Sequence, residues 1–139
     1  MLFRSLGVIY KLVEVERGGA VRNAAKFSVA KVTYPGRKQV FRFSDAGGRY
    51  TEDLIALENE QFPGAEALLV PVMAGGKRVL PATDLSEARQ RCLAGLQRLP
   101  ERVARGTADT ASAYPVRYSA RLEALLEQVR RRIEQAARI

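Results

Sequence analysis

Apolar and polar residues follow two different periods along the chain. Over residues 8–80, apolar side chains alternate with polar ones in short runs, which is the period of a β-strand. After residue 84 they recur at every third or fourth position, which is the period of an amphipathic helix. This order predicts an α+β fold rather than a doubly wound parallel sheet. We expect antiparallel strands and hairpins in the first half and two main helices in the second half.

Runs rich in β-branched and aromatic residues mark the expected strands, and glycine pairs mark turns between them. The expected strands are residues 8–16, 27–33, 37–43, 49–58 and 67–73, with a short return at 77–80. The glycine pairs are Gly18-Gly19, Gly47-Gly48 and Gly75-Gly76. A phosphate-binding loop needs a helix directly after its glycines, and no helix is expected at these points. The three pairs are therefore interpreted as hairpin turns.

A further turn is expected at Tyr34, Pro35 and Gly36, as the tip of a hairpin between residues 27–33 and 37–43. Proline presets φ at the first central position of a turn, and glycine accepts a positive φ at the next. Basic side chains flank this tip on both sides. A basic hairpin can present backbone N–H groups and cations to a phosphate or a carboxylate.

Two helices are expected after residue 84. Asp84 and Glu87 have the spacing of a capping box, and Pro100 ends the first helix. The apolar stripe of the first helix contains Leu85, Ala88, Cys92, Leu93 and Leu96, and that of the second contains Leu122, Leu125, Leu126, Val129 and Ile133. We expect the second helix to pack against the protein rather than to lie on a membrane.

The titratable residues limit the chemistry that the chain can perform. Histidine is absent, which excludes histidine-activated nucleophiles and histidine metal ligands. Cys92 lies on a helical stripe and is interpreted as a small core residue rather than a nucleophile. Asp53 lies on the same side of its strand as Ile55 and Leu57, whereas Glu52 points to the other side. An inward-facing carboxylate usually has a cationic or backbone partner, so structural pairing of Asp53 is expected.

Positive charge is concentrated in one part of the chain. The formal net charge is +8, and residues 17–49 hold eight basic residues and one acidic residue, which gives +7. Such a segment forms either an anion-binding surface or an ordinary solvated face, and charge alone leaves both open. No apolar run approaches the ~18–20 residues that a membrane span needs. The single cysteine fits a reducing, cytoplasmic setting.

Several short motifs follow one another in a known order. The first is Ile-Tyr-Lys-Leu-Val at residues 9–13. The next positions are Lys26, Ser28, Lys31, Thr33, Pro35, Gly36, Lys38, Val40 and Arg42, followed by residues 53–57, Leu99-Pro100 and residues 114–116 with Ser119 and Leu122. This order resembles the C-terminal region of nicotinate phosphoribosyltransferases over residues 6–130. Val29 departs from the family pattern, which often has an acidic residue there.

The resemblance implies an enzyme that joins nicotinate to 5-phosphoribosyl 1-pyrophosphate, giving nicotinate mononucleotide and pyrophosphate in NAD biosynthesis. It also implies ATP hydrolysis through a phosphorylated histidine, magnesium with the phosphate substrates, a homodimer and a cytoplasmic location. The implied fold is an irregular α/β barrel with a second, sheet-containing domain. Because this chain has no histidine, we expect the catalytic barrel to be absent from it. The fragment alone is expected to be inactive, with no catalytic residue and no metal ligand.

Within the resemblance, residues 6–139 are expected to form the C-terminal domain, with strands in 6–80 and helices in 84–139. Residues 1–5 match nothing in the family pattern and are expected to be a spurious or truncated start. Five residues are expected to approach phosphate-bearing ligands or a neighbouring subunit in the full enzyme: Lys31, Thr33, Gly36, Arg37 and Lys38.

Two other functions remain open. A freestanding basic module that binds anions or nucleic acid fits the charge. The 7% aromatic content and the absence of tryptophan argue against a stacking platform for single strands, and no known nucleic-acid motif is present. A structural domain that completes a sheet and braces a dimer is compatible with the enzyme interpretation, and exposed apolar surface would favour it.

Overall fold

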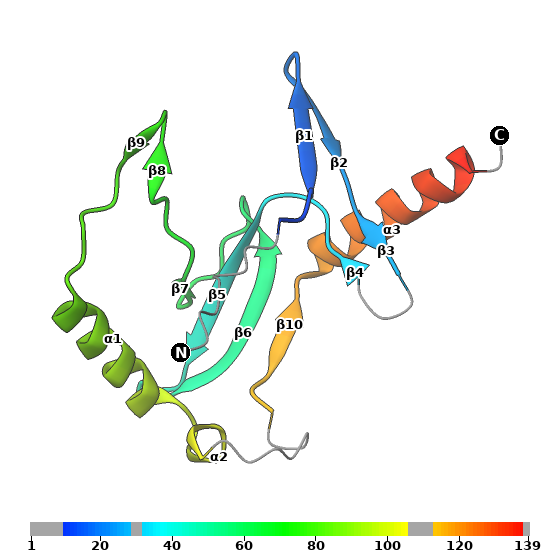
Figure 1. Cartoon of the computed structure of the whole chain (residues 1–139). Helices are drawn as coiled ribbons and strands as arrows, with labels where there is room; N and C mark the ends of the chain where they lie inside the picture. Colours follow the sequence, from blue (N-terminus) through cyan, green and yellow to red (C-terminus); the bar gives the residue numbers. More distant parts are fainter. Residues whose placement is uncertain (1–9, 29–31, 106–112, 138–139) are drawn as a thin grey trace, which may run out of the picture. The chain divides into compact units, whose positions relative to one another are not determined.

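The computed structural model describes residues 10–28, 32–105 and 113–137. The chain divides into two units, one formed by Met1–Arg37 with Ala120–Ile139 and the other by Lys38–Ser119. Each unit combines β-strands with a long helix, as the labels in Figure 1 show. The mixed content of antiparallel strands and helices confirms the predicted α+β class, with two main helices in the second half of the chain.

The unit formed by Lys38–Ser119 is built on a four-stranded sheet with the strand order β10-β6-β5-β7. β5 (Lys38–Ser44) is antiparallel to β6 (Tyr50–Leu57) and to β7 (Glu66–Ala67). β10 (Val116–Tyr118) runs parallel to β6. A parallel pair needs a long crossover, and the connection from β6 to β10 contains both helices of this unit.

One face of this sheet carries the hydrophobic core of the unit. Phe41 of β5 lies opposite Leu54 of β6, and both are buried together with Ala56. The ring of Phe62 packs edge-on against Phe41, with the ring centroids 4.9 Å apart. Because neighbouring residues of a strand point to opposite faces, Asp53 lies on the face away from this core, and it is nevertheless buried.

The helix α1 (Leu85–Arg98) begins at the predicted cap, where the Asp84 side chain accepts a hydrogen bond of 2.8 Å from the backbone N–H of Glu87. It ends before Pro100, and a short helix that the sequence pattern does not predict, α2 (Glu101–Ala104), follows. No residue of α1 is buried.

The prediction that Cys92 is a core residue is wrong, because its side chain is exposed. Helical period shows only that apolar residues share a face of α1; it does not show whether this chain covers that face. Three leucines of the same stripe, Leu85, Leu93 and Leu96, are exposed as well. The described residues therefore leave the apolar stripe of α1 open to solvent.

The other unit contains two small hairpins and the helix α3. Its elements are β1 (Glu14–Arg17), β2 (Ala20–Asn23), β3 (Lys26–Phe27), β4 (Val32–Thr33) and α3 (Ala120–Ala136). β1 pairs with β2 and β3 pairs with β4, both antiparallel. From the predicted stripe, α3 buries Leu122 and Val129. The guanidinium of Arg130 lies 4.7 Å from the centre of the Phe27 ring, which places α3 against β3.

All three glycine pairs lie in hairpin turns, as predicted. They connect β1 to β2, β5 to β6, and β8 (Met73–Ala74) to β9 (Lys77–Arg78). In the first and third of these turns both glycines have a positive φ, which is the conformation of a two-residue turn with the right twist for a hairpin.

The predicted hairpin with its tip at Pro35 and Gly36 is wrong. β4 pairs with β3, whereas β5 pairs with β6 and β7. The boundary between the two units falls between Arg37 and Lys38, so the turn residues connect strands of different sheets. The alternation of apolar residues on both sides indicates extended chain but carries no information about which strands pair.

Candidate functional site

The structure places the five predicted phosphate-proximal residues in different local settings. Lys31 lies outside the described residues. Thr33 ends β4, and Lys38 begins β5 opposite Leu57. Gly36 is buried with a φ of +77°, and its N–H donates a hydrogen bond of 2.9 Å to the carbonyl of Val13. The structure therefore does not join these residues in one hairpin.

Arg37 is held by carboxylates rather than directed at an empty anion site. Its Nε lies 2.6 Å from Glu14 Oε1, and its Nη2 lies 3.5 Å from Glu16 Oε2. The backbone N–H of Arg37 also donates to Glu14 Oε2. These contacts neutralise part of the positive charge that the sequence suggested for this segment. The Arg37 side chain is 61% exposed, whereas that of Glu14 is 15% exposed, so only the arginine side of this pair is open to a further partner.

The most highly organised polar group of the described residues lies on the face of the β5–β6 sheet opposite the hydrophobic core. Arg42 and Asp53 face each other across the two strands. Arg42 Nε donates to Asp53 Oδ1 over 2.8 Å, and Arg42 Nη2 donates to Asp53 Oδ2 over 2.7 Å. This two-pronged geometry is the strongest form of an arginine–carboxylate pair. It raises the pKa of Arg42 above its usual value, mainly through the hydrogen bond to Asp53.

Tyr114 joins this pair from the segment before β10. Its hydroxyl donates to Asp53 Oδ1 over 3.1 Å, and the backbone N–H of Asp53 donates to the carbonyl of Pro115. Burial of the phenol raises the pKa of Tyr114 to about 12, and the negative charge of Asp53 adds to the shift. Through these contacts, Asp53 connects β5 and β6 with the segment that precedes β10.

Two arginines stack on the Tyr50 ring next to this pair. The guanidinium carbon of Arg42 lies 4.5 Å from the ring centroid and that of Arg98 lies 4.3 Å from it. Arg98 is the last residue of α1, and its Nε donates to the carbonyl of Gly48 over 2.8 Å. The same side chain bonds Ser44 Oγ. This contact ties the end of α1 to the β5–β6 turn.

The predicted structural pairing of Asp53 is thus confirmed. Both carboxylate oxygens already accept hydrogen bonds from Arg42 or Tyr114, which leaves Asp53 poorly placed to take a proton from a substrate. Sequence reasoning did not find Tyr50, Arg98 or Tyr114 as members of this group. Aromatic and arginine side chains that meet across long loops leave no periodic signal in the sequence.

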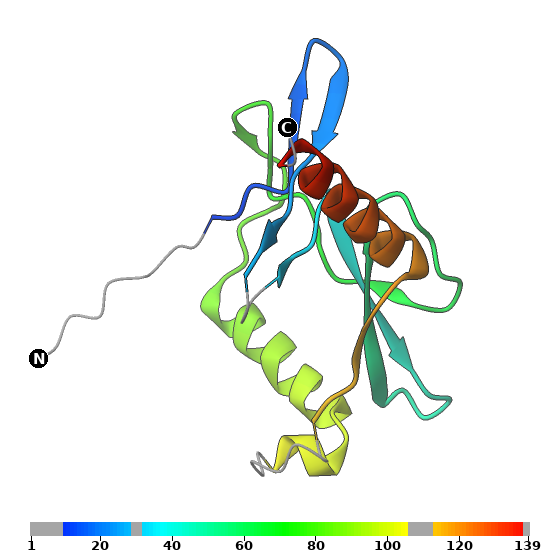
Figure 2. The same cartoon turned by 90° about the vertical axis from the view of Figure 1, so that its right-hand side faces the viewer.

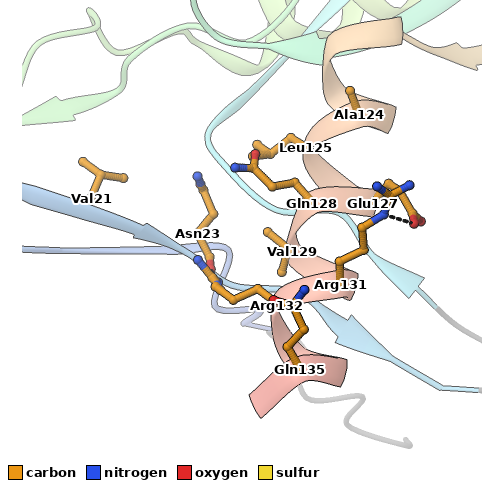
Figure 3. A pocket seen from close by; sticks show the side chains of 10 residues that line it. All are labelled: Val21, Asn23, Ala124, Leu125, Glu127, Gln128, Val129, Arg131, Arg132 and Gln135. Atoms are coloured by element: carbon orange, nitrogen blue, oxygen red, sulfur yellow. Dashed lines mark hydrogen bonds and ion pairs between the residues drawn. The ribbon is translucent and has the colours of Figure 1, made fainter. Parts of the chain in front are cut away.

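A separate cleft of about 750 Å³ is lined by residues of β2 and α3 in the other unit (Figure 3). Figure 2 shows β2 in blue and α3 in orange to red. Val21, Leu125 and Val129 supply apolar lining. The polar lining residues are Asn23, Glu127, Gln128, Arg131, Arg132 and Gln135. Arg131 pairs with Glu127 over 2.9 Å, and Arg132 donates to the carbonyl of Asn23. The cations of the cleft are therefore engaged by the protein itself.

Among the described residues, no group of three or more histidine, cysteine, aspartate or glutamate side chains could hold a metal ion. Within residues 10–28, 32–105 and 113–137, no helix has the length and apolar character to cross a membrane.

Comparison with known proteins identifies relatives of this chain. The family model "Nicotinate phosphoribosyltransferase C-terminal domain" matches residues 61–126. A nicotinate phosphoribosyltransferase of Mycobacterium tuberculosis is 38% identical over 127 residues, which is 91% of this chain but 26% of that protein. By sequence, this chain matches the C-terminal region of the nicotinate phosphoribosyltransferases.

Other nicotinate phosphoribosyltransferases give the same correspondence. That of Mus musculus is 30% identical over 147 residues, covering 90% of this chain and 27% of its own length. The crystal structure of the human nicotinic acid phosphoribosyltransferase shares the fold, with a TM-score of 0.65 at 24% identity over 79% of this chain and 25% of that one. The chain thus spans about a quarter of the length of the nicotinate phosphoribosyltransferases it matches.

The match to the family model begins downstream of the basic segment, residues 17–49. Residues 61–126 contain α1, β10 and the β8–β9 hairpin. Tyr114 and Arg98 belong to this matched region, whereas Arg42, Tyr50 and Asp53 lie before it. The polar group on the sheet therefore links the matched region to the strands that precede it.

Proposed function

We propose that this chain serves as the C-terminal domain of a nicotinate phosphoribosyltransferase. The parent enzyme joins nicotinate to 5-phosphoribosyl 1-pyrophosphate and forms nicotinate mononucleotide for NAD biosynthesis. The observation that carries the proposal is the match over 91% of the chain to a 38% identical nicotinate phosphoribosyltransferase. The fold shared with the human enzyme supports it.

The chemistry of the parent enzyme belongs to sequence outside this chain. The chain has no histidine, and its most organised carboxylate, Asp53, is fully engaged by Arg42 and Tyr114. Coupling to ATP, magnesium bound with the phosphates, ligase-type chemistry, a homodimeric assembly and a cytoplasmic location are parts of the same proposal. The role left to this chain is structural support and, through its basic segment, an approach to phosphate-bearing ligands.

The basic segment is proposed to act only within the whole enzyme. Thr33, Gly36, Arg37 and Lys38 lie in the stretch of sequence around the division between the two units, which falls after Arg37, and Lys31 precedes them in the sequence. The ion pair of Arg37 with Glu14 is open on the arginine side, where the side chain is 61% exposed, so a phosphate can add to this contact.

A chimera tests the proposal directly. The C-terminal quarter of the Mycobacterium tuberculosis enzyme that matches this chain is replaced by residues 6–139. We expect the chimera to form nicotinate mononucleotide from nicotinate, 5-phosphoribosyl 1-pyrophosphate and ATP, within about tenfold of the parent kcat/KM. The same enzyme without its C-terminal quarter is the control, and the isolated chain should be inactive. A folded chimera with no activity above the truncated control would contradict the proposal.

The high positive charge favours one alternative, a freestanding module that binds nucleic acid. That function predicts low-micromolar RNA or DNA binding by the isolated chain, with an affinity that falls by at least about tenfold between 50 and 200 mM salt. Fluorescence anisotropy with a single-stranded and a duplex probe distinguishes the two functions. Absence of binding at low salt would remove this alternative.

A further inference from the structure

Residues 68–80 are here called the arm. They follow β7 in the unit formed by Lys38–Ser119, extend away from its sheet and contain the β8–β9 hairpin (Figure 1). The arm contains five large apolar side chains that are all about half exposed or more: Leu69 (53%), Val70 (56%), Val72 (46%), Met73 (65%) and Val79 (50%). Single exposed apolar residues are normal, but five of them within one short stretch of chain favour an interaction site.

The conformation of the arm is specified despite its lack of a core. At its base, the Gln39 side chain acts as a backbone substitute: Nε2 donates to the carbonyl of Leu69 over 2.9 Å, and Oε1 accepts from the N–H of Leu69 over 2.8 Å. The N–H of Leu68 donates to the carbonyl of Val40. The base is therefore fastened to β5 by three hydrogen bonds.

The outer part of the arm is held by its own turn and hydrogen bonds. Gly75 and Gly76 have φ values of +55° and +74°, as a tight hairpin turn requires. The N–H of Val79 donates to the carbonyl of Val72 over 2.9 Å, and Arg78 Nε donates to the carbonyl of Leu80 over 2.8 Å. An isolated two-stranded hairpin is marginally stable in water, so this hairpin would gain from a surface that covers it.

The charge on the arm indicates which kind of surface fits. Residues 67–83 contain Lys77 and Arg78 and no acidic residue. A complementary surface is apolar with carboxylates at its edge, since charged groups at an interface are arranged with opposite signs. A second copy of the arm would bring like charges together. This argues against self-association through the arm.

The arm lies wholly inside the region matched by the family model, residues 61–126. The relatives are about four times as long as this chain, so in them a domain of this kind is joined to a much larger body of protein. The rest of the enzyme is therefore the partner considered for the arm.

We propose that the arm is the docking element that holds this domain against the catalytic part of a nicotinate phosphoribosyltransferase. The covering surface on the catalytic part is apolar with an acidic rim. Leu69, Val70, Val72, Met73 and Val79 supply the apolar contact, and Lys77 and Arg78 pair with the rim. This inference rests on the proposed function, because the catalytic part is that of the parent enzyme.

Thiol labelling tests the docking of the arm. In a Cys92→Ser background, Met73→Cys is placed in the isolated chain and in the chimera with the Mycobacterium tuberculosis enzyme, and the rate of reaction with a maleimide is measured. We expect Met73→Cys to react at least about tenfold more slowly in the chimera, because covered thiols are protected. Thr51→Cys, at an exposed position of β6 outside the arm, is the matched control and should react at similar rates in both proteins.

Each outcome of the labelling bears on one statement. An active chimera in which Met73→Cys reacts as fast as in the isolated chain overturns the docking proposal and leaves the proposed function standing. A folded but inactive chimera with a protected Met73→Cys overturns the proposed function and supports docking. In the isolated chain, the thiol of Met73→Cys could become more protected as the protein concentration rises, with a dimer in light scattering. That result would show that a second copy covers the arm, and it would overturn the proposal.

A second measurement does not depend on the folding of that chimera. Val72→Thr with Val79→Thr keeps β-propensity and shape but adds two hydroxyls, which are tolerated at exposed positions and are unfavourable when buried. In the isolated chain we expect the thermal midpoint to change by about 2 °C or less. A fall of much more than this would mean that the chain itself covers the arm, and the proposal would fail.

Discussion

Asp53 and Glu52 are neighbours in β6, and each accepts hydrogen bonds from an arginine, yet their surroundings differ. The Asp53 side chain is 12% exposed and that of its partner Arg42 is 25% exposed. The Glu52 pair with Arg117 is open, because Arg117 is 63% exposed. Removing one member of a buried pair leaves the other charge without compensation, whereas water replaces a lost partner at the surface.

Asp53→Asn should therefore lower the free energy of unfolding of this chain by about 2–4 kcal/mol, measured by urea denaturation. Glu52→Gln is the control from the opposite face of the same strand and should cause little measurable change. The double variant Arg42→Met with Asp53→Leu should recover much of the loss, because apolar residues of similar volume can replace a buried ion pair. Equal effects of Asp53→Asn and Glu52→Gln would contradict this account.

Tyr114 makes the stability of the chain sensitive to alkaline pH. Its folded-state pKa is raised to about 12 by burial and by Asp53, above the value of about 10 for a free tyrosine. A raised pKa gives a stabilising contribution that is complete below about pH 10 and is lost as the pH rises toward 12. Tyr114→Phe should cost about 1 kcal/mol near pH 7, through loss of the hydrogen bond to Asp53, and should lessen the decline above pH 10.

Thermal midpoints between pH 7 and pH 12 measure this effect. Tyr10→Phe, at a position that is 90% exposed, serves as the control and should follow the parent protein at every pH. If Tyr114→Phe declines above pH 10 as steeply as the parent does, then ionisation of Tyr114 is not the cause of the loss.

For single residues, the sequence predicts that a side chain is paired more reliably than it predicts which residue is the partner. Alternation along β6 placed Asp53 on an inward side, and the cost of an unpaired carboxylate in that position predicted a cationic or backbone partner. That the partner is Arg42, joined by Tyr114, depends on the register of β5 with β6 and on the path of the chain before β10. Neither is encoded in local periodicity.

Of the two long helices, α1 is the one that the described residues cover less. None of its residues is buried, and Arg98 at its end carries the bonds to Gly48, Ser44 and the Tyr50 ring. An amphipathic helix that lacks tertiary packing is marginal in water. Arg98→Ala should speed amide exchange across α1 by about tenfold, which corresponds to ~1.4 kcal/mol of local stability.

Hydrogen exchange with mass spectrometry follows α1 and the β5–β6 sheet separately. The exchange of β5 and β6 should change much less than that of α1. Arg91→Ala removes an exposed arginine from the same helix and should leave exchange unchanged. Uniform acceleration through the whole unit would mean that α1 unfolds together with the sheet rather than by itself.

The elements also show where sequence patterns stop being informative. The glycine pairs were interpreted correctly, because a two-residue turn with positive φ is a purely local structure. The Pro35-Gly36 turn was assigned to a hairpin wrongly, because strand pairing between β3, β4 and β5 depends on distant residues. The assignment of Cys92 on the apolar stripe of α1 to a core was wrong. An amphipathic pattern shows that a helix has an apolar face, but it does not show what covers that face.

For the whole molecule, the two units and the exposed apolar residues on both have one physical interpretation. Tyr10 and Leu12 are 90% and 67% exposed in one unit, and Leu85 and Met73 are 90% and 65% exposed in the other. Small bodies of protein bury a limited share of their apolar surface, and the remainder favours association. A chain that spans about a quarter of its relatives is expected to complete its packing on the rest of such an enzyme.

The proposed role of the basic segment requires the assembled enzyme, so it is tested in the chimera. In the active chimera, Arg37→Ala with Lys38→Ala should raise KM for 5-phosphoribosyl 1-pyrophosphate or ATP by about three- to tenfold, equivalent to ~1 kcal/mol of lost phosphate contact. A matched pair, Lys11→Ala with Arg17→Ala, removes the same charge from exposed positions of the first unit and should leave both KM values unchanged. A long-range effect of net charge would instead act in both pairs and weaken with salt. If Arg37→Ala with Lys38→Ala leaves both KM values and the oligomeric state unchanged, the segment is a solvated basic face and has no part in ligand binding.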